Sequence, residues 1–130
     1  MKLLAFADVH SSKKSLLRIR EKAIEHNPDF LICAGDLSMF TKGLEEAASF
    51  LNELNINTLI IPGNHETPED IQKICNKYKN IINLHRAEFI FNDYSFFGWG
   101  TGGFSFIEEE FERVEKHFKK PVILYNYPAA

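Results

Sequence analysis

Short apolar runs alternate with helical periodicity along the first part of the chain. The predicted strands are residues 2–7, 30–34 and 58–61, and the predicted helices are residues 13–26 and 44–54. Asn27-Pro28 ends the first helix, because proline disfavours a helical conformation at the residue before it. Thr67-Pro68-Glu69-Asp70 begins a third helix with a capping threonine and early acids. This alternation predicts a parallel sheet covered by helices on both faces.

The pattern changes after Lys79. Three short, partly alternating segments predict strands at residues 81–84, 88–91 and 94–98, with Asn92-Asp93 as a hairpin turn. A helix over residues 106–118 and a strand over residues 121–125 follow. The sequence contains no internal repeat or linker, so a single domain over residues 1–130 is expected.

Composition limits the classes of protein to which the chain can belong. With 130 residues, 45% of them hydrophobic, it can bury one core. The net charge of −3 weighs against a broad surface for long nucleic acid, although it permits a small anionic substrate beside a metal ion. No apolar stretch approaches the ~18 residues of a membrane span, so a cytoplasmic location is expected. Cys33 is expected to pack as a small hydrophobe, and a disulfide with Cys75 has no support.

Polar side chains follow each of the first three strands. Asp8-Val9-His10 comes after the first, Gly35-Asp36 after the second, and Gly63-Asn64-His65-Glu66 after the third. The carboxyl ends of parallel strands meet at one crevice, so these distant residues are expected to form one site. On a continuing extended strand, Asp8 and His10 would project to the same side. Carboxylate, imidazole and amide donors together suit Mn²⁺, Fe²⁺ or Zn²⁺.

Each cluster alone has an ordinary explanation. An aspartate two residues before a histidine is usually a capped turn, and Gly-Asn is common turn chemistry. Three clusters in this order, each at a strand end and about 26–28 residues apart, favour a shared functional site. His85 follows a short strand, where it could line the same crevice or be structural; the structural role is favoured.

Together the three clusters resemble the first three motifs of the calcineurin-like metallophosphoesterases, and the resemblance covers essentially the whole chain. It implies an α/β/β/α sandwich in which layered parallel and mixed sheets are flanked by helices. It also implies that Asp8 and His10 hold a first divalent metal, that Asp36 bridges both metals, and that Asn64 holds the second. His65 would contact the phosphate or the leaving group, held in place by a nearby acid.

Two departures from the family pattern affect this expectation. The segment around Asn126 resembles the fourth motif, with asparagine where the family has a metal-binding histidine. The chain ends at Ala130, before the place where a fifth motif and the last strands would follow. By the resemblance, the metal site is incomplete in this short chain and one sheet edge is left open. A homo-oligomer formed at that edge is therefore expected as a partner.

Two functions are consistent with the sequence. The first is metal-dependent hydrolysis of a small phosphomonoester or phosphodiester at a dinuclear site, impaired in this chain. The second is a non-catalytic scaffold or interaction module on the same fold, which the altered fourth motif favours. The retained Asp8, His10, Asp36, Asn64 and His65 favour the enzyme, because a scaffold has no physical need for them.

Overall fold

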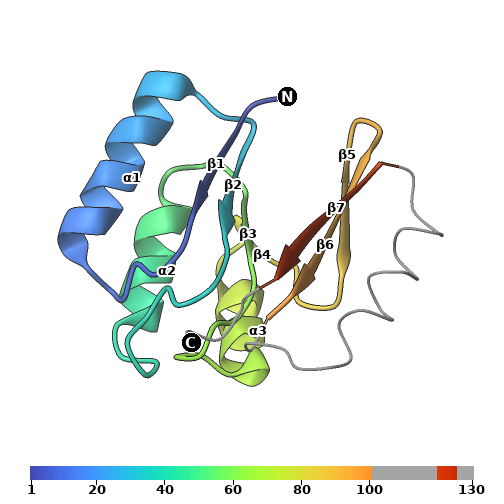
Figure 1. The fold of residues 1–130 in the computed structure, drawn as a ribbon. Helices are drawn as coiled ribbons and strands as arrows, with labels where there is room; N and C mark the ends of the chain where they lie inside the picture. Colours follow the sequence, from blue (N-terminus) through green and yellow to red (C-terminus); the bar gives the residue numbers. More distant parts are fainter. Residues whose placement is uncertain (101–119, 126–130) are drawn as a thin grey trace.

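The computed structural model describes residues 1–100 and 120–125. The elements, in chain order, are β1 (Leu3–Phe6), α1 (Lys13–His26), β2 (Phe30–Cys33), α2 (Leu44–Asn52), β3 (Thr58–Ile60), α3 (Pro68–Lys77), β4 (Ile81–Asn83), β5 (Glu88–Phe91), β6 (Tyr94–Trp99) and β7 (Pro121–Tyr125) (Figure 1). The element types predicted for these residues are confirmed, and their bounds differ by one or two residues. The helix expected over residues 106–118 and the position of Asn126 lie outside the described residues.

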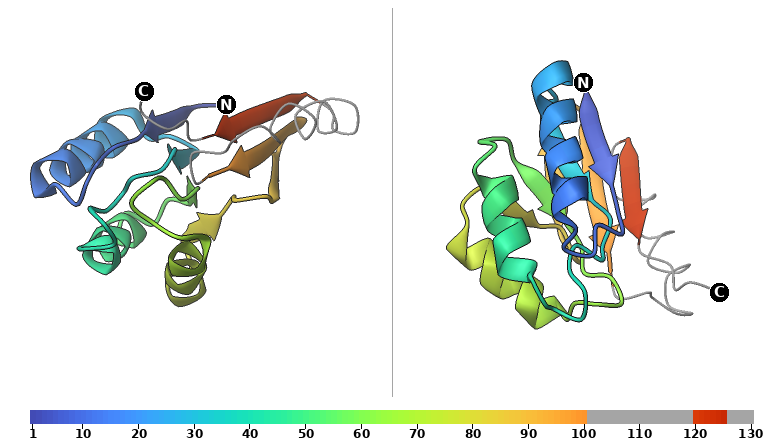
Figure 2. Two further views of the ribbon diagram at one scale, coloured as in Figure 1. Left: turned by 60° about the horizontal axis from the view of Figure 1, so that its bottom comes forward. Right: turned by 90° about the vertical axis from the view of Figure 1, so that its left-hand side faces the viewer.

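Two sheets form the centre of the fold. The first is parallel, with strand order β1-β2-β3-β4, and the second has the order β5-β6-β7. The helices α1, α2 and α3 all lie on one side of the first sheet, and the second sheet lies on the other (Figure 2). The prediction of helices on both faces is therefore wrong for the described residues, because the late strands assemble into a sheet that covers the second face. The result is a mixed α/β architecture in which helices flank the parallel sheet on one face and the second sheet covers the other.

Each face of the parallel sheet has its own apolar core. Side chains of the helices pack on one face, among them Leu16, Leu51 and Ile71. Phe30 is at the centre of the core between the two sheets, with ring centroids 5.6, 5.3 and 5.1 Å from those of Phe89, Phe91 and Phe96. Cover on both faces buries every residue of β2 and β3, and it explains why β2 is a continuous apolar run.

Local signals in the sequence set the helix ends. Ser12 caps α1 by accepting the Ser15 N–H at 3.2 Å, and Asn27 ends it in a left-handed conformation with φ 47°. Thr67 caps α3 by accepting the Asp70 N–H at 3.1 Å, as its position before Pro68 predicts. The caps at Ser12 and Thr67 fix where the loops that follow β1 and β3 end.

The second sheet starts with the predicted hairpin. Strands β5 and β6 pair antiparallel, and Asn92 turns the chain between them with φ 54°. Strand β7 then pairs parallel with β6. Neither Cys33 nor Cys75 is in a disulfide, and Cys33 is buried as expected.

Candidate functional site

The loops that follow β1, β2 and β3 lie side by side at the carboxyl edge of the parallel sheet. The backbone N–H groups of Asp8 and His10 donate to the carbonyls of Gly35 and Asp36, at 3.2 and 3.0 Å. The third loop joins the second where the His65 N–H donates to Asp36 Oδ1 at 3.0 Å. Asn64 is exposed in this same loop. The structure therefore brings the three predicted clusters together.

Several residues other than glycine adopt left-handed backbone conformations in these loops. Asp8, His10, Ser11 and Asp36 have φ values of 56°, 51°, 58° and 54°. Such conformations cost about 1–3 kcal/mol each for residues other than glycine. The expectation that Asp8 and His10 continue an extended strand is wrong, since β1 ends at Phe6 and the chain turns sharply.

Asp8 and His10 are nonetheless close. Asp8 Oδ1 is 4.0 Å from His10 Nε2, and the Asp8 side chain is 69% exposed. His10 Nδ1 is buried and has no hydrogen-bond partner. A buried, unpaired nitrogen is costly, and such groups often belong to functional sites.

Asp36, in the loop after β2, is packed closely against the loop after β3. It is only 7% exposed. A Cβ added to Gly63 would be 2.1 Å from Asp36 Oδ1 and 2.4 Å from the Asp36 backbone nitrogen. Only glycine at position 63 permits this approach of the two loops.

The ring of His65 is positioned by the backbone of the second loop. Its Nδ1 accepts the Phe40 N–H at 3.1 Å, and its ring centroid is 4.4 Å from that of Phe40 and 4.9 Å from that of His10. In the neutral ring the proton is therefore on Nε2, which becomes a hydrogen-bond donor. The family resemblance implied that a nearby acid holds the His65 ring in place. Among the described contacts, the Phe40 N–H holds it instead.

Glu66 is a residue of the site whose role the sequence did not reveal. It is 4% exposed, and its carboxylate accepts hydrogen bonds from Asp36, Ser38 and Gly63. Periodicity gives no signal for a buried acid in a loop. Its place directly after His65 in the third motif is the one feature that could have drawn attention to it.

Negative charge is concentrated around the end of β2. The pKa of Cys33 is raised to about 12, chiefly by burial and in smaller part by the carboxylates of Glu66, Asp36 and Asp8. The thiol therefore stays protonated and is neither a ligand nor a nucleophile near neutral pH. Three carboxylates acting on one buried atom form an electrostatic environment that favours a cation.

The donor types at this edge suit a divalent metal. Asp8 and Asp36 offer carboxylate oxygens, and His10 offers an imidazole with one unpaired nitrogen. Within residues 1–100 and 120–125, no three His, Cys, Asp or Glu side chains are already gathered as a group that could hold an ion. The site therefore fits a divalent metal in the types of donor atom that it offers and in the placement of its three loops.

His85, in the loop after β4, has a structural contact. Its Nδ1 accepts the Gly100 N–H at 2.9 Å, which ties the loop after β4 to the loop after β6. Burial lowers the pKa of His85, and the neighbouring Arg86 lowers it further. The ring is therefore neutral at pH 7, in keeping with the structural alternative.

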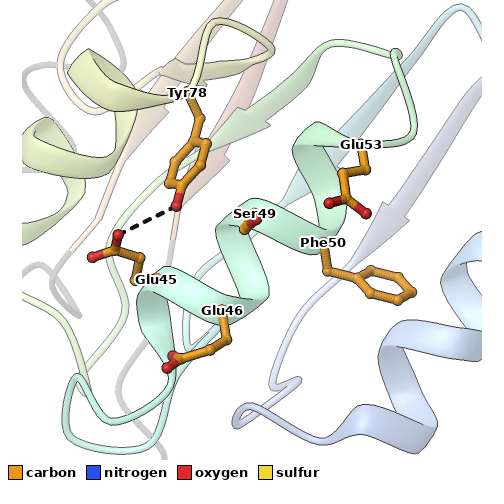
Figure 3. Close-up of a pocket in the computed structure, with 6 residues that line it drawn as sticks. All are labelled: Glu45, Glu46, Ser49, Phe50, Glu53 and Tyr78. Atoms are coloured by element: carbon orange, nitrogen blue, oxygen red, sulfur yellow. Dashed lines mark hydrogen bonds between the residues drawn. The ribbon is translucent and has the colours of Figure 1, made fainter.

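An acidic hollow lies elsewhere, along α2. Figure 3 shows its lining residues: Glu45, Glu46, Ser49 and Phe50 from α2, and Glu53 and Tyr78, which directly follow α2 and α3. The Tyr78 hydroxyl donates to Glu45 Oε1 at 3.3 Å. Glu45 is paired with Lys77, but the carboxylates of Glu46 and Glu53 leave the hollow negatively charged, which disfavours a phosphate there.

The described helices include none that is both long and apolar enough to cross a membrane.

Comparisons with known proteins agree with this architecture. No curated protein matches the chain. Among solved structures, TT1561 of Thermus thermophilus has a TM-score of 0.74 at 14% identity, with 95% of this chain and 66% of that chain covered. A structure described as a novel archaeal phosphodiesterase has a TM-score of 0.68 at 15% identity, covering 98% and 84%. The phosphoesterase Yfce from E. coli has a TM-score of 0.54 at 17% identity, covering 74% and 55%.

At these identities the solved structures establish the fold alone. The family assignment rests on a sequence comparison, in which the family described as calcineurin-like phosphoesterase matches residues 1–127. Because this match spans nearly the whole chain, the protein belongs to the calcineurin-like phosphoesterase family.

Proposed function

We propose that the protein is a metal-dependent phosphoesterase that hydrolyses a small phosphomonoester or phosphodiester at the strand-end site. The observation that carries the proposal is the meeting of Asp8, His10, Asp36 and His65 through the hydrogen bonds that join three loops. Asp8 and His10 would hold a first divalent ion, Asp36 would bridge two ions, and Asn64 would hold the second. Mn²⁺, Fe²⁺ and Zn²⁺ all suit these donors.

Bound ions would neutralise charge on the phosphoryl oxygens and make an attacking water more acidic. The residues of the chain supply the rest. Asp36, which is packed against the loop after β3, would set the separation of the two ions. Neutral His65, whose Nδ1 accepts the Phe40 N–H, would donate a hydrogen bond from Nε2–H to the departing oxygen and stabilise the charge that develops there as the phosphorus–oxygen bond breaks.

The proposal is tested by Mn²⁺-dependent hydrolysis of bis-p-nitrophenyl phosphate and p-nitrophenyl phosphate. Turnover that disappears in Asp36→Asn and falls in His65→Gln supports it. Turnover that survives Asp36→Asn refutes the assignment of that residue, since a bridging carboxylate cannot be replaced by an amide without weakening both ion positions.

The rival function is a non-catalytic scaffold on the same fold. Asn126, in place of the expected histidine, favours it. The buried Nδ1 of His10, which has no hydrogen-bond partner, counts against it, because such groups often belong to functional sites. A scaffold would bind no Mn²⁺ and hydrolyse neither ester, and Asp36→Asn would leave its behaviour unchanged.

A second copy of the chain is the proposed protein partner. Strand β1 is the terminal strand of the four-stranded sheet, and Leu3 is 37% exposed on it. An edge strand offers unpaired backbone groups to another chain. Light scattering after gel filtration distinguishes the dimer, which supports this pairing, from a monomer, which excludes it. Replacing Ala5 by proline should dissociate a dimer built on this edge.

A further inference from the structure

A buried carboxylate occupies the junction of the loops that follow β2 and β3. Glu66 Oε1 accepts the N–H of Asp36 at 3.0 Å and the N–H of Gly63 at 3.1 Å. Glu66 Oε2 accepts the N–H of Ser38 at 2.9 Å and its O–H at 2.6 Å. One side chain therefore binds four donors and joins the two loops directly.

The bond to Asp36 acts on the strained part of the site. Asp36 has a φ of 54°, and its backbone N–H is held by Glu66. The Asp36 side chain in turn accepts the His65 N–H at 3.0 Å. Glu66 fixes the backbone of Asp36, and Asp36 fixes the backbone of His65, so the two interactions form one chain of contacts.

The charge of Glu66 has no cationic partner in the described structure. None of the ion pairs between described residues joins it to lysine or arginine, and its four donors are neutral. Burying a carboxylate in this way is costly, and an apolar side chain would serve packing better. A carboxylate is required where four donors must be accepted by one group that has no donor of its own.

We propose that Glu66 is a positioning residue of the metal-dependent site. Its carboxylate holds the backbone of Asp36, and through it His65, in the arrangement that binds the ions, without contacting metal or substrate. The inference rests on the proposed function, because it concerns the residue to which both ions are assigned. Residues that orient metal ligands typically change metal affinity about 10–100-fold when they are replaced.

The test is Glu66→Gln, which keeps the shape but places an NH₂ group against two N–H or O–H donors. Three quantities are measured: the Mn²⁺ dissociation constant, the melting temperature, and amide hydrogen exchange in the metal-free protein. We expect Mn²⁺ binding to weaken at least about tenfold. We also expect faster exchange at the amides of Asp36, Ser38, Gly63 and His65 in a protein that is still folded.

Two control variants separate positioning from charge and from general stability. Ser38→Ala removes one hydrogen bond to Oε2 and keeps the negative charge, so a smaller loss of Mn²⁺ affinity is expected. Thr67→Ala removes the cap of α3 next to Glu66 in the chain, and should lower the melting temperature without changing Mn²⁺ affinity.

Unchanged Mn²⁺ affinity in folded Glu66→Gln overturns the inference, as does a loss of affinity in Thr67→Ala that matches its loss of melting temperature. If Glu66→Gln does not fold, Ser38→Ala decides: weaker Mn²⁺ binding at an unchanged melting temperature supports the inference, and unchanged binding overturns it. Wild-type protein that binds no Mn²⁺ refutes the proposed function instead. Exchange at the His65 amide in folded Glu66→Gln then decides whether Glu66 positions this loop.

Discussion

Gly63→Ala should damage the site selectively, because the added methyl group has no space. Its Cβ would lie 2.1 Å from Asp36 Oδ1, 2.4 Å from Asp36 Cγ and 2.4 Å from the Asp36 backbone nitrogen. The backbone atom cannot rotate away, so the loop after β3 must move from the loop after β2. That movement would weaken the contacts of Glu66 with Gly63 and Asp36.

Overpacking of this kind costs about 1–3 kcal/mol. For a chain of this length, about 1 kcal/mol corresponds to a fall in melting temperature of roughly 4 °C, so a loss of roughly 4–12 °C is expected. Mn²⁺ affinity should fall as well, because Asp36 is displaced. Thermal unfolding followed by circular dichroism and a Mn²⁺ titration at room temperature measure the two effects.

Gly98→Ala is the matched control. Its Cβ would lie 2.6 Å from Ile61 Cγ2 and 2.7 Å from the Leu84 carbonyl oxygen, between the two sheets and away from the proposed ligands. It should lose comparable stability and keep its Mn²⁺ affinity. A Gly63→Ala protein with wild-type melting temperature and Mn²⁺ affinity would refute the close packing of the two loops.

Three further predictions concern the core and the titratable groups. Phe30→Ala should lose about 3–5 kcal/mol of unfolding free energy in urea, because Phe30 joins both sheets; a loss below about 1 kcal/mol would contradict its central place. Burial raises the pKa of Cys33 and of Cys75 from 9.0 to about 12, so the unfolded chain releases these protons first and stability should fall as pH rises from 9 toward 12. A Cys33→Ala, Cys75→Ala double variant should show a flatter decline over that range, and an equal slope would show that the thiols do not contribute. The pKa of His85 is lowered from 6.5, so the unfolded chain binds the proton more readily and stability should be lost as pH falls below 6.5. In His85→Asn this part of the stability profile should be flatter, and an unchanged profile would contradict burial of the ring.

The sequence predicted most of the fold because its signals are local. Helical periodicity and caps located α1 and α3, and apolar runs located the strands of the parallel sheet. The arrangement of layers was predicted less well. Which side of a sheet a later segment covers depends on contacts between distant residues such as Phe30 and Phe96, and no local pattern encodes these contacts.

The candidate site shows the same limit. Strand ends and spacing predicted that Asp8, Asp36 and His65 would meet. They did not predict the left-handed turn at Asp8 and His10, which depends on hydrogen bonds to the neighbouring loop. The partner of His65 is a backbone N–H, which every residue other than proline carries, so residue identity gives no hint of it.

The most direct test of the proposed metal site is a titration with Mn²⁺ followed by NMR, since this ion broadens the amide signals of residues close to it. We predict that broadening begins in the three loops, at Asp8 to Ser11, Gly35 to Leu37 and Gly63 to His65. Broadening that begins at Glu45, Glu46 and Glu53, in the hollow along α2, would contradict the placement of the metal site at the strand ends.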